Sequence, residues 1–343
     1  MTIYDVASRA GVSPGTVSKV LAERQHVSAR TRALVLQAVS DLDYAPHATA
    51  RNLSRRRTQI LGLILPYGAD YLFGDPFLLD CIRGIDDYAE AHDYYLLLCT
   101  AKPQATPTGP VGRLLPRGSV DGAVVLEAAA SAALVPQLER QGYPWVTLGY
   151  PATQEGRIRN AIHADDYGGA LAMTRHLHRL GHTRIGVISG PPHWMGALEA
   201  RLAGVRLAQH EAGQPPDPAL IAYGDFTPES GYQAAAQLLA ARPAPTALFA
   251  LNDRMALGAA RLLAERGLHV PQDISLAGFD DIAAAAMANP PLATVRQPGF
   301  QMGIRAATVL AQLISGELAY FENIVLPTEL VSRASAGPVP GAV

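Results

Sequence analysis

The chain has 343 residues, of which 49% are hydrophobic and 17% are charged, and its formal net charge is −2. This composition is typical of globular proteins and excludes a disordered chain. Because one hydrophobic core rarely grows beyond about 250–300 residues, the length predicts two or three domains. No apolar run reaches the roughly 18 residues that a membrane-spanning helix needs, and the first residues do not resemble a signal peptide. We therefore expect a cytoplasmic protein with no membrane partner, and we expect Cys81 and Cys99 to be free thiols.

The charge is distributed unevenly along the chain. Residues 1–59 contain nine Lys and Arg against four Asp and Glu, a net charge of +5. The remaining residues carry 19 basic and 26 acidic side chains, a net charge of −7. A basic segment of this kind favours binding to phosphates. A solvated charge run would explain Arg55–Arg57 alone, but not the helical pattern that precedes them.

Residues 2–21, TIYDVASRAGVSPGTVSKVL, have the pattern of a helix-turn-helix. Thr2 is suited to cap a first helix and Gly11 to end it, while Ser13 and Pro14 are suited to begin a second. The apolar residues at helical spacing are Ile3, Val6, Ala7, Ala10, Val17, Val20 and Leu21. The alternative is that these two short amphipathic helices are simply part of a core.

A third helix is predicted to begin at Val27–Ser28 and to complete a three-helix bundle. Its apolar face is expected to contain Leu34, Val35, Ala38, Val39 and Leu42. Residues 46–57, PHATARNLSRRR, then predict a short helix that ends in three arginines.

From residue 60 onward, short apolar runs alternate with helical segments. The predicted strands are 60–65, 94–99, 122–127, 145–149, 184–189, 246–251 and 274–279, and the predicted helices include 76–92, 166–180, 197–212, 229–241 and 253–266. Such alternation favours parallel sheets covered by helices, with ligands bound outside the carboxyl ends of the strands. The segment 100–120 contains several Pro and Gly residues and is predicted to be a loop.

These features together resemble the LacI/GalR (lactose-repressor-like) family of bacterial transcriptional regulators. The resemblance rests on the helix-turn-helix, on PHATARNL, and on the later motifs GHTRIGVISGP, ARLAGV, ALFALNDRMALGA, ISLAGFDD and LATVRQP, in the family's order. It implies an all-α helix-turn-helix head plus an α/β body with two doubly wound parallel-sheet subdomains of periplasmic-binding-protein type.

The resemblance also implies domain limits. They are 1–45 for the DNA-binding domain, 46–59 for the hinge and 60–343 for the effector-binding and dimerisation domain. Within the body, the first subdomain is expected at about 60–160 plus 293–322 and the second at about 161–292 plus 323–337. The chain is then expected to cross between them near 158–163, 288–293 and 320–326.

The function implied is that of a ligand-responsive repressor that binds a pseudo-palindromic, double-stranded DNA operator as a homodimer. Base reading would fall to the exposed face of the second helix, formed by Ser13, Pro14, Gly15, Thr16, Ser18 and Lys19. Because Pro14 and Gly15 offer no side-chain hydrogen bonds, direct readout would depend on the other residues. Tyr4 and His26 match positions that contact the DNA backbone; a packed aromatic and a solvated loop residue are the alternatives.

In the hinge, the family uses a leucine as a wedge in the minor groove, and Leu53, beside Ala50 and Arg51, matches that position. Unstacking the duplex costs a few kcal/mol and is offset by added contacts. The alternative is that Leu53 packs onto the body.

In the body, Arg201 and Asp280 match the family's ligand-binding pair. A guanidinium and a carboxylate suit the vicinal hydroxyls of a sugar ring. Phe226 would stack on the ligand, and the other implied cleft residues are Phe77, Trp194 and Asn252. Helix capping by Asp280 or Asp281 and a surface ion pair of Arg201 are the alternatives. Gly149 replaces an Asp of some sugar-binding relatives, so a nucleobase or nucleoside remains the second class of effector.

Other functions find less support in the sequence. A transport-type solute-binding protein fits the body but not the basic head. His176, His178 and His182 lack a fourth ligand at zinc spacing, and we expect no metal or cofactor. Asp165 and Asp166 suit a helix cap better than a catalytic pair. With no nucleotide-binding or nucleophile motif, an enzyme is not expected.

Overall fold

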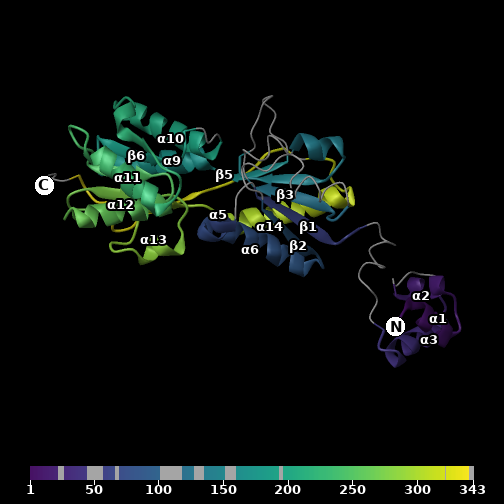
Figure 1. Ribbon diagram of the computed structural model, residues 1–343. Coiled ribbons are helices and arrows are strands. Elements are labelled where there is room, and N and C mark those ends of the chain that lie inside the picture. The colour runs from purple at the N-terminus through teal and green to yellow at the C-terminus, as the bar shows by residue number, and fades with distance from the viewer. Residues whose placement is uncertain are drawn as a thin grey trace. The chain divides into compact units, whose positions relative to one another are not determined.

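The computed structural model describes residues 1–21, 27–44, 57–65, 69–100, 118–126, 135–150, 160–192, 196–320 and 322–339 (Figure 1). The chain divides into two compact units, Met1–Gln59 and Ile60–Val343. Several predicted site residues lie outside the described residues, namely His26, Ala50, Arg51, Leu53 and Trp194. The Pro- and Gly-rich segment lies outside them as well, except for its ends.

The first unit contains three helices, α1 (Ile3–Ala10), α2 (Pro14–Leu21) and α3 (Ala29–Asp41). Thr2 and Asp5 form a capping box, in which the Thr2 N–H donates to Asp5 Oδ2 at 2.7 Å. Gly11 follows α1 with φ 65°, a left-handed conformation that a Cβ disfavours. The predicted start and end of the first helix are therefore confirmed.

The core of this unit is small and apolar. Its buried residues are Val6, Ala7, Ala10, Val17, Val20, Val35, Ala38 and Tyr44. Leu34 was expected on the same face, but it is 50% exposed. The expectation is wrong because Val35 and Ala38, three residues apart, set the inward face, and Leu34 lies about 100° away from Val35 on the helix.

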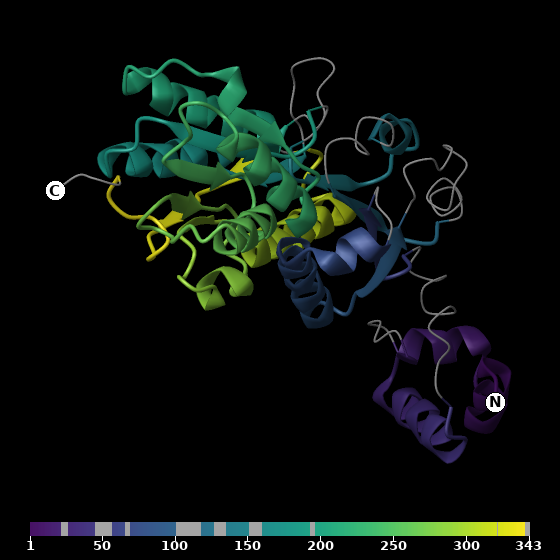
Figure 2. The ribbon, with the colours of Figure 1, turned by 60° about the vertical axis from the view of Figure 1, so that its left-hand side comes forward.

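The second unit contains two subdomains. The first has a six-stranded parallel sheet in the order β11-β5-β4-β3-β1-β2. Its strands are β1 (Ile60–Leu65), β2 (Tyr95–Thr100), β3 (Gly122–Leu126), β4 (Trp145–Leu148), β5 (Ala161–Ala164) and β11 (Ile324–Leu326). Its named helices are α5 (Ala69–Gly74), α6 (Pro76–Ala91) and α14 (Gly299–Ser315). α6 and α14, far apart in sequence, lie side by side (Figure 2).

The second subdomain has a parallel sheet in the order β7-β6-β8-β9 and an antiparallel pair, β10 with β12. These strands are β6 (Ile185–Ser189), β7 (Ile221–Tyr223), β8 (Ala247–Ala250), β9 (Ser275–Ala277), β10 (Thr294–Arg296) and β12 (Glu329–Val331). The helices are α9 (Asp166–Arg179), α10 (Ala197–Glu211), α11 (Pro228–Leu239), α12 (Asp253–Glu265) and α13 (Ala283–Met287), with a short 3-10 turn at Pro218–Leu220.

The sheets correct the expected limits of the subdomains at three places. β5, expected in the second subdomain, pairs with β4 in the first sheet, and β11 also joins that sheet by pairing with β5. β10, expected in the first subdomain, pairs with β12 in the second. The chain thus crosses after β5, between β10 and α14, and between β11 and β12. These strands have only three or four residues, too few for a hydrophobic period to reveal them.

Candidate functional site

The second helix presents a small polar face. Ser13, Gly15 and Lys19 are exposed, whereas Val17 and Val20 point into the core. The Ser13 hydroxyl accepts the Thr16 N–H at 3.2 Å and lies 2.9 Å from the Thr16 hydroxyl. Two of the residues predicted to contact bases are therefore hydrogen-bonded to each other. Pro14, Thr16 and Ser18 are half-buried. The Tyr4 side chain on α1 is 71% exposed, which excludes the packed-aromatic alternative.

A cavity of about 90 Å³ is lined by residues of both subdomains. Five of the six predicted effector residues line it: Phe77, Arg201, Phe226, Asn252 and Asp280. The first of these comes from α6 and the others from the second subdomain. The structure therefore brings together residues that are spread over 200 positions of the chain.

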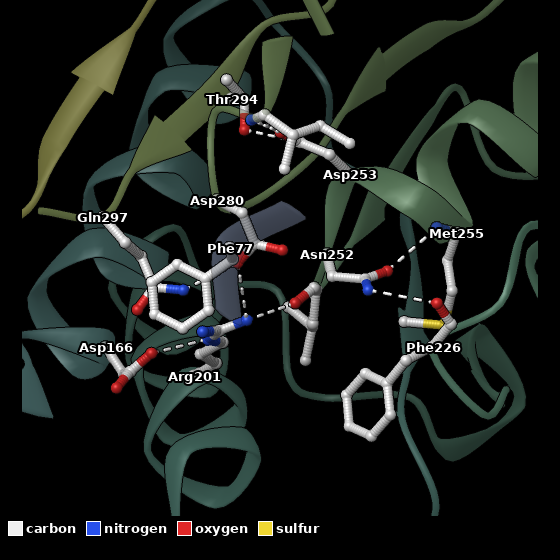
Figure 3. Close-up of polar contacts among 12 residues, drawn as sticks. Phe77, Asp166, Arg201, Phe226, Asn252, Asp253, Met255, Asp280, Thr294 and Gln297 are labelled. Carbon is white, nitrogen blue, oxygen red and sulfur yellow. Dashed lines mark hydrogen bonds and ion pairs between the residues drawn. The ribbon is translucent and has the colours of Figure 1, made fainter. Parts of the chain in front are cut away.

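Arg201, on α10, lies at the centre of this group (Figure 3). Its Nε donates to Asp166 Oδ1 at 2.7 Å, and its Nη1 donates to the Leu251 carbonyl and lies 3.7 Å from Asp280 Oδ1. Its Cζ lies 3.8 Å from the centre of the Phe279 ring. Because the side chain is only 8% exposed, the alternative of a surface ion pair is excluded.

Asp280 follows β9 in a strained conformation with φ 117°. Its Oδ1 accepts a hydrogen bond from Gln297 Nε2 at 2.7 Å. Burial raises the pKa of this carboxyl well above its usual value, and Arg201 opposes the shift. No side chain caps α13, so the helix-capping alternative is wrong for Asp280. The neighbouring Asp281 instead forms ion pairs with Arg296 and Arg333.

A hydrogen bond links the Asn252 side chain to the backbone of Phe226. The Asn252 Oδ1 caps α12 by accepting the Met255 N–H at 2.9 Å, and its Nδ2 donates to the Phe226 carbonyl at 3.4 Å. Phe226 has φ 68°, and its ring lies against Gly190, where a Cβ would overlap it. Asn252 therefore helps to position the residue that is expected to stack on the ligand.

Two carboxylates of the cavity were not predicted. Asp75 caps α6 by accepting the Phe77 N–H at 3.0 Å, and burial raises its pKa. Asp166 is 2% exposed and binds Arg201, while its neighbour Asp165 caps α9 through the Gly168 N–H. The Asp-Pro pair at 75–76 was a visible signal for a helix start. Asp166 was hidden because β5, which precedes it, was not recognised as a strand.

An aromatic pair, which was also not predicted, forms another part of the wall. The rings of Tyr150 and His163 have their centres 3.9 Å apart. His163 Nδ1 donates to the Ala164 carbonyl at 2.7 Å, and its Nε2 lies 2.7 Å from Asn323 Nδ2. Burial, together with the charges of Asp166 and Asp165, raises the pKa of Tyr150 to about 12.

The cavity is equipped for binding. Cys81 lines it, but burial raises the pKa of this thiol well above its usual value, so the sulfur stays protonated. Among the described residues, no group of three or more His, Cys, Asp or Glu side chains is arranged to hold a metal ion. Within the same ranges no helix is long and apolar enough to cross a membrane. Charged hydrogen-bonding groups beside aromatic rings suit a polar ligand with one apolar face.

Known proteins resemble this chain in both of its units. Residues 2–47 match the model of bacterial regulatory proteins of the lacI family, and residues 174–336 match a periplasmic binding protein-like domain. The HTH-type transcriptional regulator CelR of Thermobifida fusca is 35% identical over 334 residues, which cover 97% of this chain and 98% of CelR.

Solved structures give the same result. A complex of the transcriptional regulator CelR with cellobiose is 34% identical, with a TM-score of 0.75, and the match covers 98% of this chain and 99% of the other. The lac repressor dimer bound to operator and the anti-inducer ONPF is 29% identical, with a TM-score of 0.84 and the same coverage.

Proposed function

Since this chain belongs to the lacI family of bacterial regulatory proteins and is a transcriptional regulator, we propose that it represses transcription as a homodimer on a pseudo-palindromic operator. We further propose that a sugar or sugar derivative, bound in the cleft between the subdomains, controls the affinity for DNA. The effector acts through its different affinities for two arrangements of the subdomains.

One observation carries the proposal for the effector. The buried guanidinium of Arg201 and the carboxylate of Asp280 lie 3.7 Å apart and face one cavity with the Phe226 ring. A guanidinium beside a carboxyl group suits neighbouring hydroxyls, and the ring matches the apolar face of a pyranose. The similarity to a regulator that was solved with cellobiose supports the same class of ligand.

For the DNA, we propose that Ser13, Thr16, Ser18 and Lys19 of α2 read bases and that Leu53 enters the minor groove. The exposure of Gly15 and Lys19 supports a reading face that approaches a groove closely. Because much of the affinity would come from phosphate contacts, binding should weaken steeply with salt.

The test is titration of the full chain onto DNA from its own upstream region, at several salt concentrations, with a panel of sugars and nucleosides. We expect a pseudo-palindromic footprint and release by at least one sugar. Release by a nucleoside alone would replace the sugar with the second class of effector. Ligand binding without any DNA binding would favour a solute-binding protein instead.

Asp280→Asn is the matched variant, because Asn keeps the shape of the side chain and tolerates positive φ. We expect it to weaken effector binding about 10- to 100-fold, from the loss of one hydrogen-bond acceptor, and to leave operator affinity unchanged. Asp273→Asn, at a site where the carboxylate is half exposed, is the control. An unchanged effector response in Asp280→Asn would remove Asp280 from the site.

A further inference from the structure

The cavity holds more buried acid than base. Among its described lining residues, Asp75, Asp166 and Asp280 are carboxylic acids, and Arg201 is the single guanidinium. His163 also lines the cavity, where its ring contacts the Ala164 carbonyl and the Asn323 side chain. The acids come from both subdomains: Asp75 begins α6, whereas Asp166 and Asp280 belong to the second subdomain.

Arg201 already faces protein acceptors. Its Nε donates to Asp166, and its Nη1 faces the Leu251 carbonyl and the Asp280 carboxylate (Figure 3). The guanidinium is also stacked on Phe279. An anionic ligand would have to compete with two carboxylates for this cation, at a site where burial makes an unpaired charge costly.

The acceptors, in contrast, are open to a ligand. One oxygen of each acid is bound: Asp75 Oδ1 by the N–H groups of α6, Asp166 Oδ1 by Arg201, and Asp280 Oδ1 by Gln297. The other oxygen of each carboxyl has no hydrogen-bond partner among the described residues. The cavity therefore offers several acceptors for hydroxyl or ammonium donors.

Burial and the charges of the cavity change the pKa values of its acids and of the Tyr150 phenol. Burial raises the pKa of Asp75, Asp166 and Asp280. Arg201 opposes the shift of Asp166 and Asp280, and Arg254 opposes the shift of Asp75 more strongly than Arg201 does. The Tyr150 phenol, on the same wall, responds to burial and to the charges of Asp166 and Asp165 with a pKa of about 12. An added anion would raise these pKa values further, whereas an added cation would lower them.

We propose that the cleft selects polyhydroxylated ligands without an anionic group, namely neutral sugars and amino sugars, and rejects sugar phosphates and sugar acids. This inference rests on the proposed carbohydrate effector and narrows its chemical class. In the first subdomain, the residue that discriminates against anionic ligands is Asp75. Its buried carboxyl group lines the same cavity as the Arg201–Asp280 pair of the second subdomain.

The test uses the full chain and sets of sugars matched in everything but charge. Glucose, galactose and mannose are each compared with their 2-amino, 6-phosphate and uronic acid forms, and cellobiose is compared with cellobionic acid. Binding is measured by thermal shift, and each ligand that binds is then titrated by calorimetry. We expect a neutral or amino form to bind at least 100-fold more tightly than its anionic counterpart.

Asp75→Asn removes one charge but keeps an oxygen that can cap α6. We expect it to reduce the discrimination against the anionic form about 10- to 100-fold, as one unit charge several ångströms away requires. Asp86→Asn, an exposed acid on the same helix, is the matched control and should leave the discrimination unchanged.

The outcomes separate this inference from the proposed function. An anionic form that binds as tightly as its neutral counterpart, with release of the operator retained, overturns the charge selection and leaves the sugar-responsive regulator standing. Unchanged discrimination in Asp75→Asn removes Asp75 from the selection. If no sugar of either class binds, both the carbohydrate effector and its charge preference are rejected. Operator binding then still tests whether the chain is a DNA-binding regulator.

Discussion

At the residue scale, two neighbouring side chains at the start of α12 have different tasks, and the second of them, Asp253, holds the loop that carries Asp280. Asn252 caps α12, and Asp253 accepts the Thr294 hydroxyl at 2.6 Å and the Ile282 N–H at 2.9 Å. Asp253 thus connects α12, β10 and the segment in which Asp280 and Asp281 have positive φ values. Because burial raises its pKa to about 7, this connection depends on pH.

The stability of the body should fall as the pH rises from 5 to 7. The folded-state pKa of Asp253, about 7, lies above that of an unfolded aspartate, so the folded protein binds the proton more tightly and loses that advantage as pH rises. The slope would be at most about 1.4 kcal/mol per pH unit for this group. Thermal or urea unfolding across this range measures it.

Asp253→Asn should flatten that profile, while lowering the overall unfolding free energy by about 1–3 kcal/mol because one accepted hydrogen bond is lost. Asp86→Asn, on the exposed face of α6, should keep the wild-type slope. A variant profile as steep as the wild type would show that other buried acids with raised pKa values, such as Asp75, Asp166 and Asp280, govern the pH dependence.

At the element scale, α6 and α14 come from distant parts of the sequence and pack closely against each other in the first subdomain. A Cβ at Gly84 on α6 would overlap the Phe300 carbonyl oxygen, and a Cβ at Gly303 on α14 would overlap that of Cys81. The backbones of the two helices therefore meet at glycines. The same α6 places Asp75 and Phe77 in the cleft, so this contact also sets one wall of the site.

Gly84→Ala should separate the two helices and lower the unfolding free energy of the body by about 1–3 kcal/mol, the usual cost of overpacking. Urea unfolding followed by circular dichroism measures the loss. Ala91→Ser, at the exposed end of α6, is the control and should change stability by less than about 0.5 kcal/mol. Equal stability in Gly84→Ala would show that α14 shifts without cost.

The elements that could be predicted from the sequence are those with a long apolar or helical pattern. The seven predicted strands and the five predicted helices of the body are present, with ends that differ by at most two residues. β5, β7, β10, β11 and β12 were missed because each has only three or four residues and, unlike the equally short β4, β8 and β9, none lies within one of the longer apolar runs used for the prediction. Asp166 could not be assigned to the cleft because the strand before it, β5, was not recognised. Asp75 and Tyr150 adjoin predicted elements, but no sequence pattern marks their side chains as facing the cleft.

At the scale of the whole molecule, a basic DNA-binding unit of residues 1–59 is joined to a body that carries the cleft. The predicted hinge, residues 46–59, is the segment of chain that connects the DNA-binding helices to the first strand of the body. The proposed wedge, Leu53, belongs to this connecting segment, and it gives the proposal its most direct test.

Leu53→Ala should bend the operator less and bind it at least about tenfold more weakly, because the wedge no longer supports the unstacked step. Gel phasing measures the bend and gel shift the affinity. Leu36→Ala removes a 50% exposed leucine from α3 and serves as the control. An equal bend in Leu53→Ala and the wild type would refute the wedge.

The three crossings between the subdomains have a consequence for the order of biosynthesis. The DNA-binding helices are complete by residue 41, whereas the first sheet needs β11 at Ile324–Leu326 and the second subdomain needs β12 at Glu329–Val331. Domains generally fold from the N-terminus as the ribosome delivers them. A growing chain therefore carries a folded DNA reader for nearly all of its translation, and it gains a sensor only when its final residues emerge. A premature stop at almost any codon of the body would leave a reader that no effector can control.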